Sequence, residues 1–112
     1  DDGLIYISRN EGVDWENVTP KELPEWTLIS TIEVSTHEPN TVYVAATRYK
    51  LNDTRPLLYR SKNCGKTWDL ITTGIPDGAF TRVIREDPLR VGCLYTGTES
   101  GIYFSLNQGE SW

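Results

Sequence analysis

Apolar and polar residues alternate with a period of two in short segments along most of the chain. Such alternation is typical of β-strands that bury one face. Stretches containing Pro, Gly and Asn separate the segments, as is usual for turns. No segment has a helical period, so the sequence predicts an all-β, antiparallel fold. The predicted strands are residues 3–8, 14–18, 30–35, 41–46, 57–61, 68–72, 81–86, 92–96 and 102–105.

One frame, Ser-x-Asn-x-Gly-x-x-Trp, occurs three times, and each copy follows an apolar run that contains Tyr. Gly takes the left-handed backbone that a tight turn requires, and Asn bonds to backbone N–H groups. The frame therefore predicts a strand, a tight turn and a strand that starts with Trp as a buried anchor. The copies are Ser8, Asn10, Gly12 and Trp15 (first turn), Ser61, Asn63, Gly65 and Trp68 (second turn), and Ser105, Asn107, Gly109 and Trp112 (third turn).

This frame resembles the Asp-box, or bacterial neuraminidase repeat, of β-propellers, and the resemblance covers essentially the whole chain. Proteins with this box include sialidases, xyloglucan-degrading glycoside hydrolases, the sortilin ectodomain and a photosystem II assembly factor. The runs TVYVAATRYKLNDTRPLLYRSKNCGKTW and FTRVIREDPLRVGCLYTGTESGIYFS look most similar to secreted bacterial proteins and sortilin-like proteins of this group. All three copies have Asn where the family has Asp, which keeps the hydrogen bonding of the turn but removes the carboxylate.

The resemblance implies four-stranded antiparallel blades, and the repeat spacing fits about two to two and a half of them. We expect a partial blade with its connector in residues 1–28, a complete blade in 29–73, and a blade lacking most of its outer strand in 74–112. A propeller closes with about four to eight blades. The chain is therefore expected to need further blades or self-association. Trp26, in the first connector, is expected to fill the gap between blades, with stacking on a sugar as the alternative.

Composition narrows the function classes. The formal net charge of −5 disfavours a nucleic-acid partner, because phosphate binding needs clustered Lys and Arg. No run has the length of a membrane span, and no residues have the spacing of a metal site, a Ser/His/Asp triad or a phosphate loop, so we expect no cofactor or metal. Cys64 and Cys93 permit a disulfide, but their expected places in different blades favour free thiols.

Strand alternation predicts that the three frame turns share one face and that the loops between second and third strands build the other. Propeller ligands usually meet the second face, where loops vary on a rigid scaffold. An aromatic ring beside cations and carboxylates can hold a sugar or a peptide. The alternatives are a solvated loop with internal salt bridges over 47–55, and a Glu33–Arg82 pairing across inner strands. The candidate ligand-binding residues are Arg48, Tyr49, Lys50, Asp53, Arg82 and Glu99.

The sequence leaves three function classes open: an enzyme fragment, a binding module and an assembly scaffold. We favour a segment of an exported propeller that acts as a ligand-binding or interaction scaffold, with a carbohydrate or peptide ligand. The alternative is part of a xyloglucanase-like or sialidase-like glycoside hydrolase, whose two carboxylates flank the scissile bond. No catalytic residue is identified from the sequence. The resemblance also implies a secreted or periplasmic location.

Overall fold

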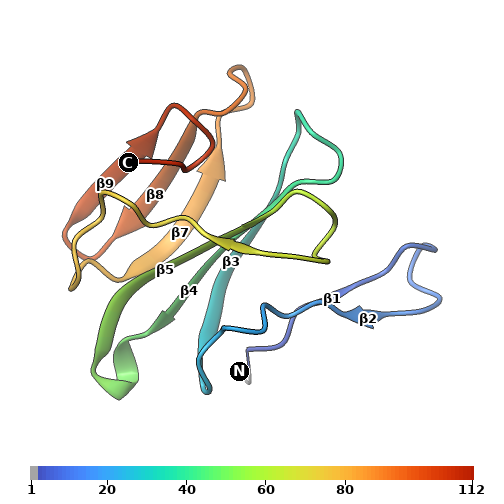
Figure 1. Cartoon of the computed structure of the whole chain (residues 1–112), viewed down its shortest axis with the longest axis horizontal. Helices are drawn as coiled ribbons and strands as arrows, with labels where there is room; N and C mark the ends of the chain where they lie inside the picture. Colours follow the sequence, from blue (N-terminus) through green and yellow to red (C-terminus); the bar gives the residue numbers. More distant parts are fainter. Residues whose placement is uncertain (1–2) are drawn as a thin grey trace.

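Three antiparallel sheets make up the computed structural model, which describes residues 3–112 (Figure 1). Each strand pairs with its neighbour in the sequence, so the predicted all-β antiparallel fold is confirmed. The first sheet is β1 (Tyr6–Ile7) and β2 (Glu16–Asn17); the second is β3 (Leu28–Val34), β4 (Val42–Arg48), β5 (Asp53–Ser61) and β6 (Asp69–Leu70); the third is β7 (Thr81–Glu86), β8 (Leu94–Thr98) and β9 (Gly101–Ser105).

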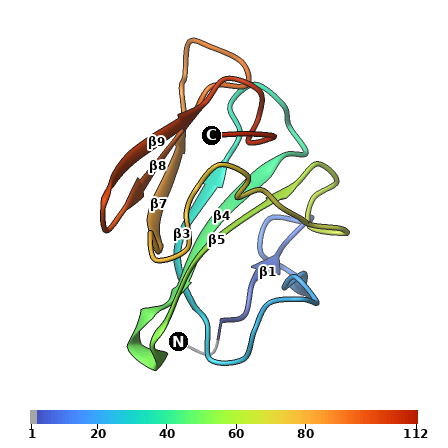
Figure 2. The ribbon, with the colours of Figure 1, turned by 60° about the vertical axis from the view of Figure 1, so that its left-hand side comes forward.

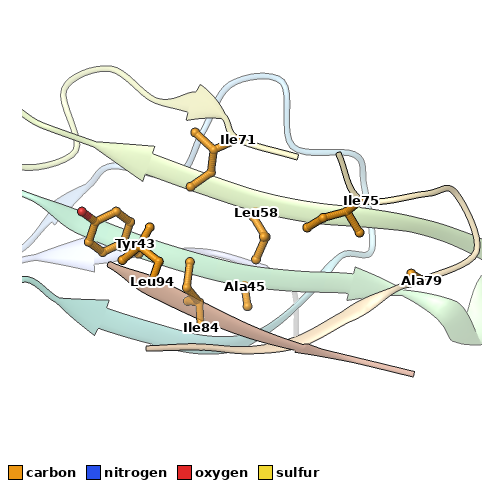
Figure 3. Packing of buried hydrophobic residues seen from close by; sticks show 8 residues of the cluster. All are labelled: Tyr43, Ala45, Leu58, Ile71, Ile75, Ala79, Ile84 and Leu94. Atoms are coloured by element: carbon orange, nitrogen blue, oxygen red, sulfur yellow. The ribbon is translucent and has the colours of Figure 1, made fainter. Parts of the chain in front are cut away.

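The second sheet lies between the other two (Figures 1 and 2). One of its two central strands, β4, is buried on both faces. In β4, Val44 and Ala46 belong to the core shared with the β1–β2 hairpin, whereas Tyr43 and Ala45 belong to the core shared with β7–β9. An uninterrupted apolar run is what a strand covered on both faces requires. Figure 3 shows the core shared with β7–β9, whose buried members are Tyr43, Ala45, Leu58, Ile71, Ile75, Ala79, Ile84 and Leu94.

The three frame turns are built by the same local hydrogen bonds. In each turn the Ser Oγ accepts a hydrogen bond from the Gly N–H, at 2.7, 2.7 and 2.8 Å in chain order. The Asn Oδ1 accepts one from the backbone N–H four residues later, at 2.8, 2.9 and 3.1 Å. The residue before each Gly is also left-handed, with φ between 57° and 61°. The residues in this position are Glu11, Cys64 and Gln108.

The Trp of the second and third turns reaches across to the preceding sheet. The Trp68 indole donates to the Val18 carbonyl at 2.7 Å, and the Trp112 indole donates to the Ile71 carbonyl at 2.6 Å. Trp15 differs, because its side chain is 63% exposed. The expectation that it is a buried anchor is wrong, since no sheet within residues 3–112 covers that side of the β1–β2 hairpin.

The frame turns lie at the same end of the sheets as the turns that follow the inner strands. Cys64 N donates to Asn40 O at 3.0 Å, and Gln108 N donates to Gly92 O at 2.9 Å. The β4–β5 turn lies at the opposite end of β4, at the bottom of Figure 1. We call the end that carries the frame turns the frame end, and the end that carries the β4–β5 turn the hairpin end. Both Cys64 and Cys93 are free.

Candidate functional site

The β4–β5 connection at the hairpin end is a tight turn. The predicted strand ends at 46 and 57 are wrong, because Arg48 and Asp53 pair as the last and first residues of the two strands. The internal salt bridges considered for residues 47–55 are present, since Asp53 pairs with Arg48 and Arg55. Between them the chain reverses through a 3₁₀ turn, η1 (Tyr49–Leu51), and Asn52, whose φ is +61°. Asn tolerates this left-handed conformation better than most residues, which allows so short a connection.

A cluster of charges fixes this turn. The Asp53 carboxylate accepts hydrogen bonds from Arg55 at 2.7 and 2.9 Å and from Arg48 at 2.7 Å. The hydrogen bonds from Arg55, and to a smaller extent the one from Arg48, hold the pKa of the Asp53 carboxyl well below its usual range. Partial burial of the carboxyl opposes them. Asp53 is therefore ionised at neutral pH. Arg48 also donates from Nε to the carbonyl of Glu25 at 2.9 Å, which ties the first connector to the turn.

Next to these charges, an aromatic and cationic platform joins the second and third sheets. The rings of Tyr49 and Phe80 stack with centroids 5.0 Å apart and planes 7° apart. The Arg82 guanidinium lies 5.4 Å from the Tyr49 centroid and 5.2 Å from that of Phe80. Glu99 holds Arg82 through an ion pair of 3.0 Å. Stacking and cation–π contacts of this kind each contribute about 1 kcal/mol to holding the three side chains together.

Trp26 stands exposed beside this platform. The expectation that it fills the gap between blades is wrong, because its side chain is 72% exposed and Leu23 packs against the first core instead. Its backbone is left-handed, with φ +62°. A hollow of ≈ 330 Å³ lies next to the ring. The hollow is lined by Trp26, Leu28, Thr47, Arg48, Tyr49, Lys50 and Leu51.

The structure brings the six predicted ligand-binding residues to one end of the molecule. Four of them lie in or beside the β4–β5 turn, and Lys50 among them is exposed. The other two, Arg82 and Glu99, reach the turn through Tyr49. Trp26 was named from the sequence as a ligand-stacking residue only as an alternative, and Leu51 and Phe80 were missed. The aromatic character of Phe80 was an available signal, whereas nothing in the sequence singles out Leu51.

The inner strands pair differently from the expectation. Glu33 lies 3.9 Å from Arg85 of the neighbouring inner strand and accepts a hydrogen bond from the Glu86 N–H at 3.0 Å. Arg82 pairs with Glu99 of its own sheet instead. Across β3 and β7, Glu33 therefore meets Arg85 and not Arg82.

The frame end also carries polar contacts between the sheets. The Ser35 hydroxyl lies 2.8 and 3.0 Å from the two Glu86 carboxylate oxygens and donates its one hydrogen to them, and the Thr36 N–H donates to Glu86 at 2.9 Å. The His37 ring forms a hydrogen bond with the Asp87 carbonyl at 2.8 Å. These groups satisfy one another, so they fasten the two sheets rather than point toward a ligand.

Two negative observations apply to residues 3–112. No group of three or more His, Cys, Asp or Glu side chains is placed to hold a metal ion. In the same residues, no helix combines the length and the apolar character needed to cross a membrane.

Comparison with solved structures places the fold. The chain superposes on a structure described as "YCF48 bound to D1 peptide" with a TM-score of 0.74 and 18% sequence identity. That protein is a β-propeller. The fold is that of β-propeller blades. The match covers 99% of this chain and 33% of YCF48, so the chain spans about a third of the length of its neighbour. No model of a known protein family and no curated protein matches the sequence.

Proposed function

We propose that this chain is a protein-interaction scaffold that binds an extended peptide at the hairpin end. The observation that carries the proposal is the exposed Trp26 ring beside a hollow that Tyr49 and Leu51 also line. The fold likeness to a propeller that holds a peptide supports the same function. The Asp-box resemblance of the three frame turns supports membership of that group of propellers, and with it a secreted or periplasmic location.

The chemistry of the hollow suits a peptide with an apolar side chain. Trp26 is 72% and Leu51 is 50% exposed, so an apolar side chain placed between them removes surface of both partners from water. Lys50 is exposed at the rim and can donate to a peptide carbonyl or carboxylate. Arg48 is paired with Asp53, so it forms part of the wall without requiring a charged ligand.

A glycoside hydrolase is less well supported by these residues. Such an enzyme needs one carboxylic acid with a raised pKa to protonate the leaving group. The pKa of Asp53 is instead lowered by Arg55 and Arg48, and Glu99 is ion-paired with Arg82. Neither Asp53 nor Glu99 therefore has the environment of a general acid. A carbohydrate therefore remains an outcome to test as a ligand rather than the proposed one.

Binding of a phage-displayed library of 12-residue peptides to the full chain tests this proposal, with a glycan array as the second arm. We expect selected peptides to bind and Trp26→Ala to weaken them about tenfold or more, since aromatic anchors in hollows carry much of the binding free energy. Lys50→Ala is expected to weaken them less. Neither change should alter the melting temperature, because both side chains are exposed.

Leu89→Ala is the matched control, because Leu89 is 89% exposed and follows β7 at the frame end. It should leave peptide binding unchanged. Binding that survives Trp26→Ala but is lost in Leu89→Ala would move the site to the frame end. Glycans that bind while no peptide does would replace the peptide with a carbohydrate.

A further inference from the structure

The two connectors of the chain share one turn but differ at one position in it. Residues 23–34 align with residues 75–86 without a gap, which matches their proline residues and puts Trp26 in the place of Gly78. Both residues are left-handed, with φ of +62° and +96°. Gly adopts this conformation without steric cost, whereas a bulky side chain is strained in it. The turn itself therefore favours Gly, and the presence of Trp26 needs another explanation.

This position in the turn is open to solvent even where a complete sheet precedes the connector. The four-stranded second sheet precedes Gly78, whose N–H donates to the Thr54 carbonyl of that sheet at 3.1 Å. A Cβ added at Gly78 would nevertheless meet no atom within 4 Å apart from its chain neighbours. Trp26 is 72% exposed at the matching position. Its exposure therefore follows from its place in the turn.

The β4–β5 hairpin is a second place where the chain departs from its own repeat. Counted from the frame Ser of each sheet, the Thr98–Gly101 pair that closes the β8–β9 turn corresponds to the Ala46–Leu57 pair. Residues 47–56 therefore extend the hairpin relative to the third sheet. Five of the residues that line the hollow beside the first connector come from this extension. The two departures from the repeat thus meet at one hollow.

The free polar groups that line this hollow are hydrogen-bond donors. Within residues 3–112 the Trp26 indole N–H has no carbonyl partner, in contrast to the two frame indoles that bond across sheets. The Lys50 ammonium is exposed, and both groups donate only. The Tyr49 hydroxyl donates or accepts. Thr47 Oγ1 already accepts the Tyr49 N–H at 3.3 Å, and Arg48 already donates to a carboxylate and a carbonyl.

These donors match the backbone of a proline-rich segment better than that of a β-strand. β4 has a strand on each side, so a peptide cannot join the hairpin through it as a further strand. A peptide that carries N–H groups would also find few acceptors among the lining side chains. Proline has no N–H, and the carbonyls of a polyproline II helix make no internal hydrogen bonds. Its rings pack on aromatic side chains.

We propose that the hollow selects a proline-rich segment in the polyproline II conformation. Its rings lie against Trp26 and Tyr49, and its carbonyls accept from the indole N–H and from Lys50. A volume of ≈ 330 Å³ is at the low end for ligand sites, roughly 300–1,000 Å³, and suits a few residues of such a segment. This inference rests on the proposed function, which requires a peptide at this site but not a proline-rich one.

Fluorescence anisotropy of a labelled ten-residue oligoproline, titrated with the full chain, tests the proposal against a labelled Gly/Ser peptide of the same length and charge. We expect the oligoproline to bind at least about tenfold more tightly. Trp26→Gly gives the first connector the residue of the second, so it should weaken oligoproline binding about tenfold or more. Its melting temperature should not fall, because Gly relieves the strain of the left-handed position.

Leu89→Ala, at an exposed position of the frame end, is the control and should bind oligoproline like the unchanged chain. Equal binding of the two labelled peptides overturns the proline preference, as does oligoproline binding that Trp26→Gly leaves unchanged. Library peptides that bind through Trp26 but contain no proline would overturn this inference and keep the proposed function. If no peptide of either kind binds, both are overturned.

Discussion

The first and second frame turns have the same local structure but different surroundings. In both, the Ser Oγ accepts the Gly N–H at 2.7 Å, and the Asn Oδ1 accepts a backbone N–H at 2.8 or 2.9 Å. Trp68 then bonds to the carbonyl of Val18 in the preceding sheet, whereas Trp15 is mostly exposed. The turn is therefore formed by its own residues, and the role of the Trp depends on a neighbouring sheet.

This difference separates two contributions to stability. The hydrogen bonds of the turn join residues that are close in the sequence, and each contributes about 1 kcal/mol to stability. The contact of a frame Trp and Gly with the preceding sheet joins residues about 50 positions apart and removes apolar surface from water. We expect the second contribution to dominate wherever a neighbouring sheet is present.

Replacing the Trp of each turn gives the largest expected effect. Trp68→Ala should lower the free energy of unfolding by about 3 kcal/mol, as for a large-to-small core change, because it loses both packing and the bond to Val18. Trp15→Ala should change it by less than about 0.5 kcal/mol, as at an exposed site. Urea unfolding of both variants measures the difference, and equal losses would contradict the distinction between the turns.

Replacing the Gly of each turn by Ala isolates the packing part of the difference. Gly12 and Gly65 both have a left-handed backbone, with φ of 90° and 86°, so both variants carry a similar strain of about 1–2 kcal/mol. A Cβ at Gly65 would lie 2.7 Å from the Val18 Cβ, whereas one at Gly12 meets only the Trp15 ring at 3.9 Å.

Gly65→Ala is therefore expected to cost about 1–3 kcal/mol more than Gly12→Ala, the usual cost of overpacking. Thermal unfolding of the two variants side by side measures this. Identical melting temperatures would mean that the second turn is not held against Val18.

Removing the Asp53 carboxylate should destabilise the chain slightly without changing any frame turn. The pKa of Asp53 is lowered by Arg55 and Arg48, so its stabilisation is fully present above the unfolded-state pKa of about 4 and is lost as pH falls through the lower folded-state value. We expect Asp53→Asn to lower the melting temperature at pH 7 by about 4 °C, corresponding to about 1 kcal/mol, and by less in strong acid. A difference that is constant with pH would contradict this assignment.

The strands were predictable because their signal is local. The alternation in β3 and β7 and the apolar run in β4 correspond directly to one buried face or two. The positions where β4 ends and β5 begins were not predictable, because the polar residues near 47–55 have the composition of a loop. Their extension as strands follows from the Arg48–Asp53 pairing, which only the folded register reveals.

The candidate site was predictable as an end of the molecule but not as a set of contacts. Strand alternation placed Tyr49 and Glu99 on one side, where they lie. The stack of Tyr49 on Phe80 and the exposure of Trp26 depend on how the segments pack in the folded chain. A sequence pattern does not specify either of these.

Hydrogen exchange of the indole N–H groups, measured by NMR at a concentration where the chain is monomeric, tests the central distinction most directly. The indole protons of Trp68 and Trp112 should exchange slowly, because each is bonded to a carbonyl of the preceding sheet. That of Trp15 should exchange as fast as that of the exposed Trp26. Protection of Trp15 equal to that of Trp68 in the monomer would contradict the account.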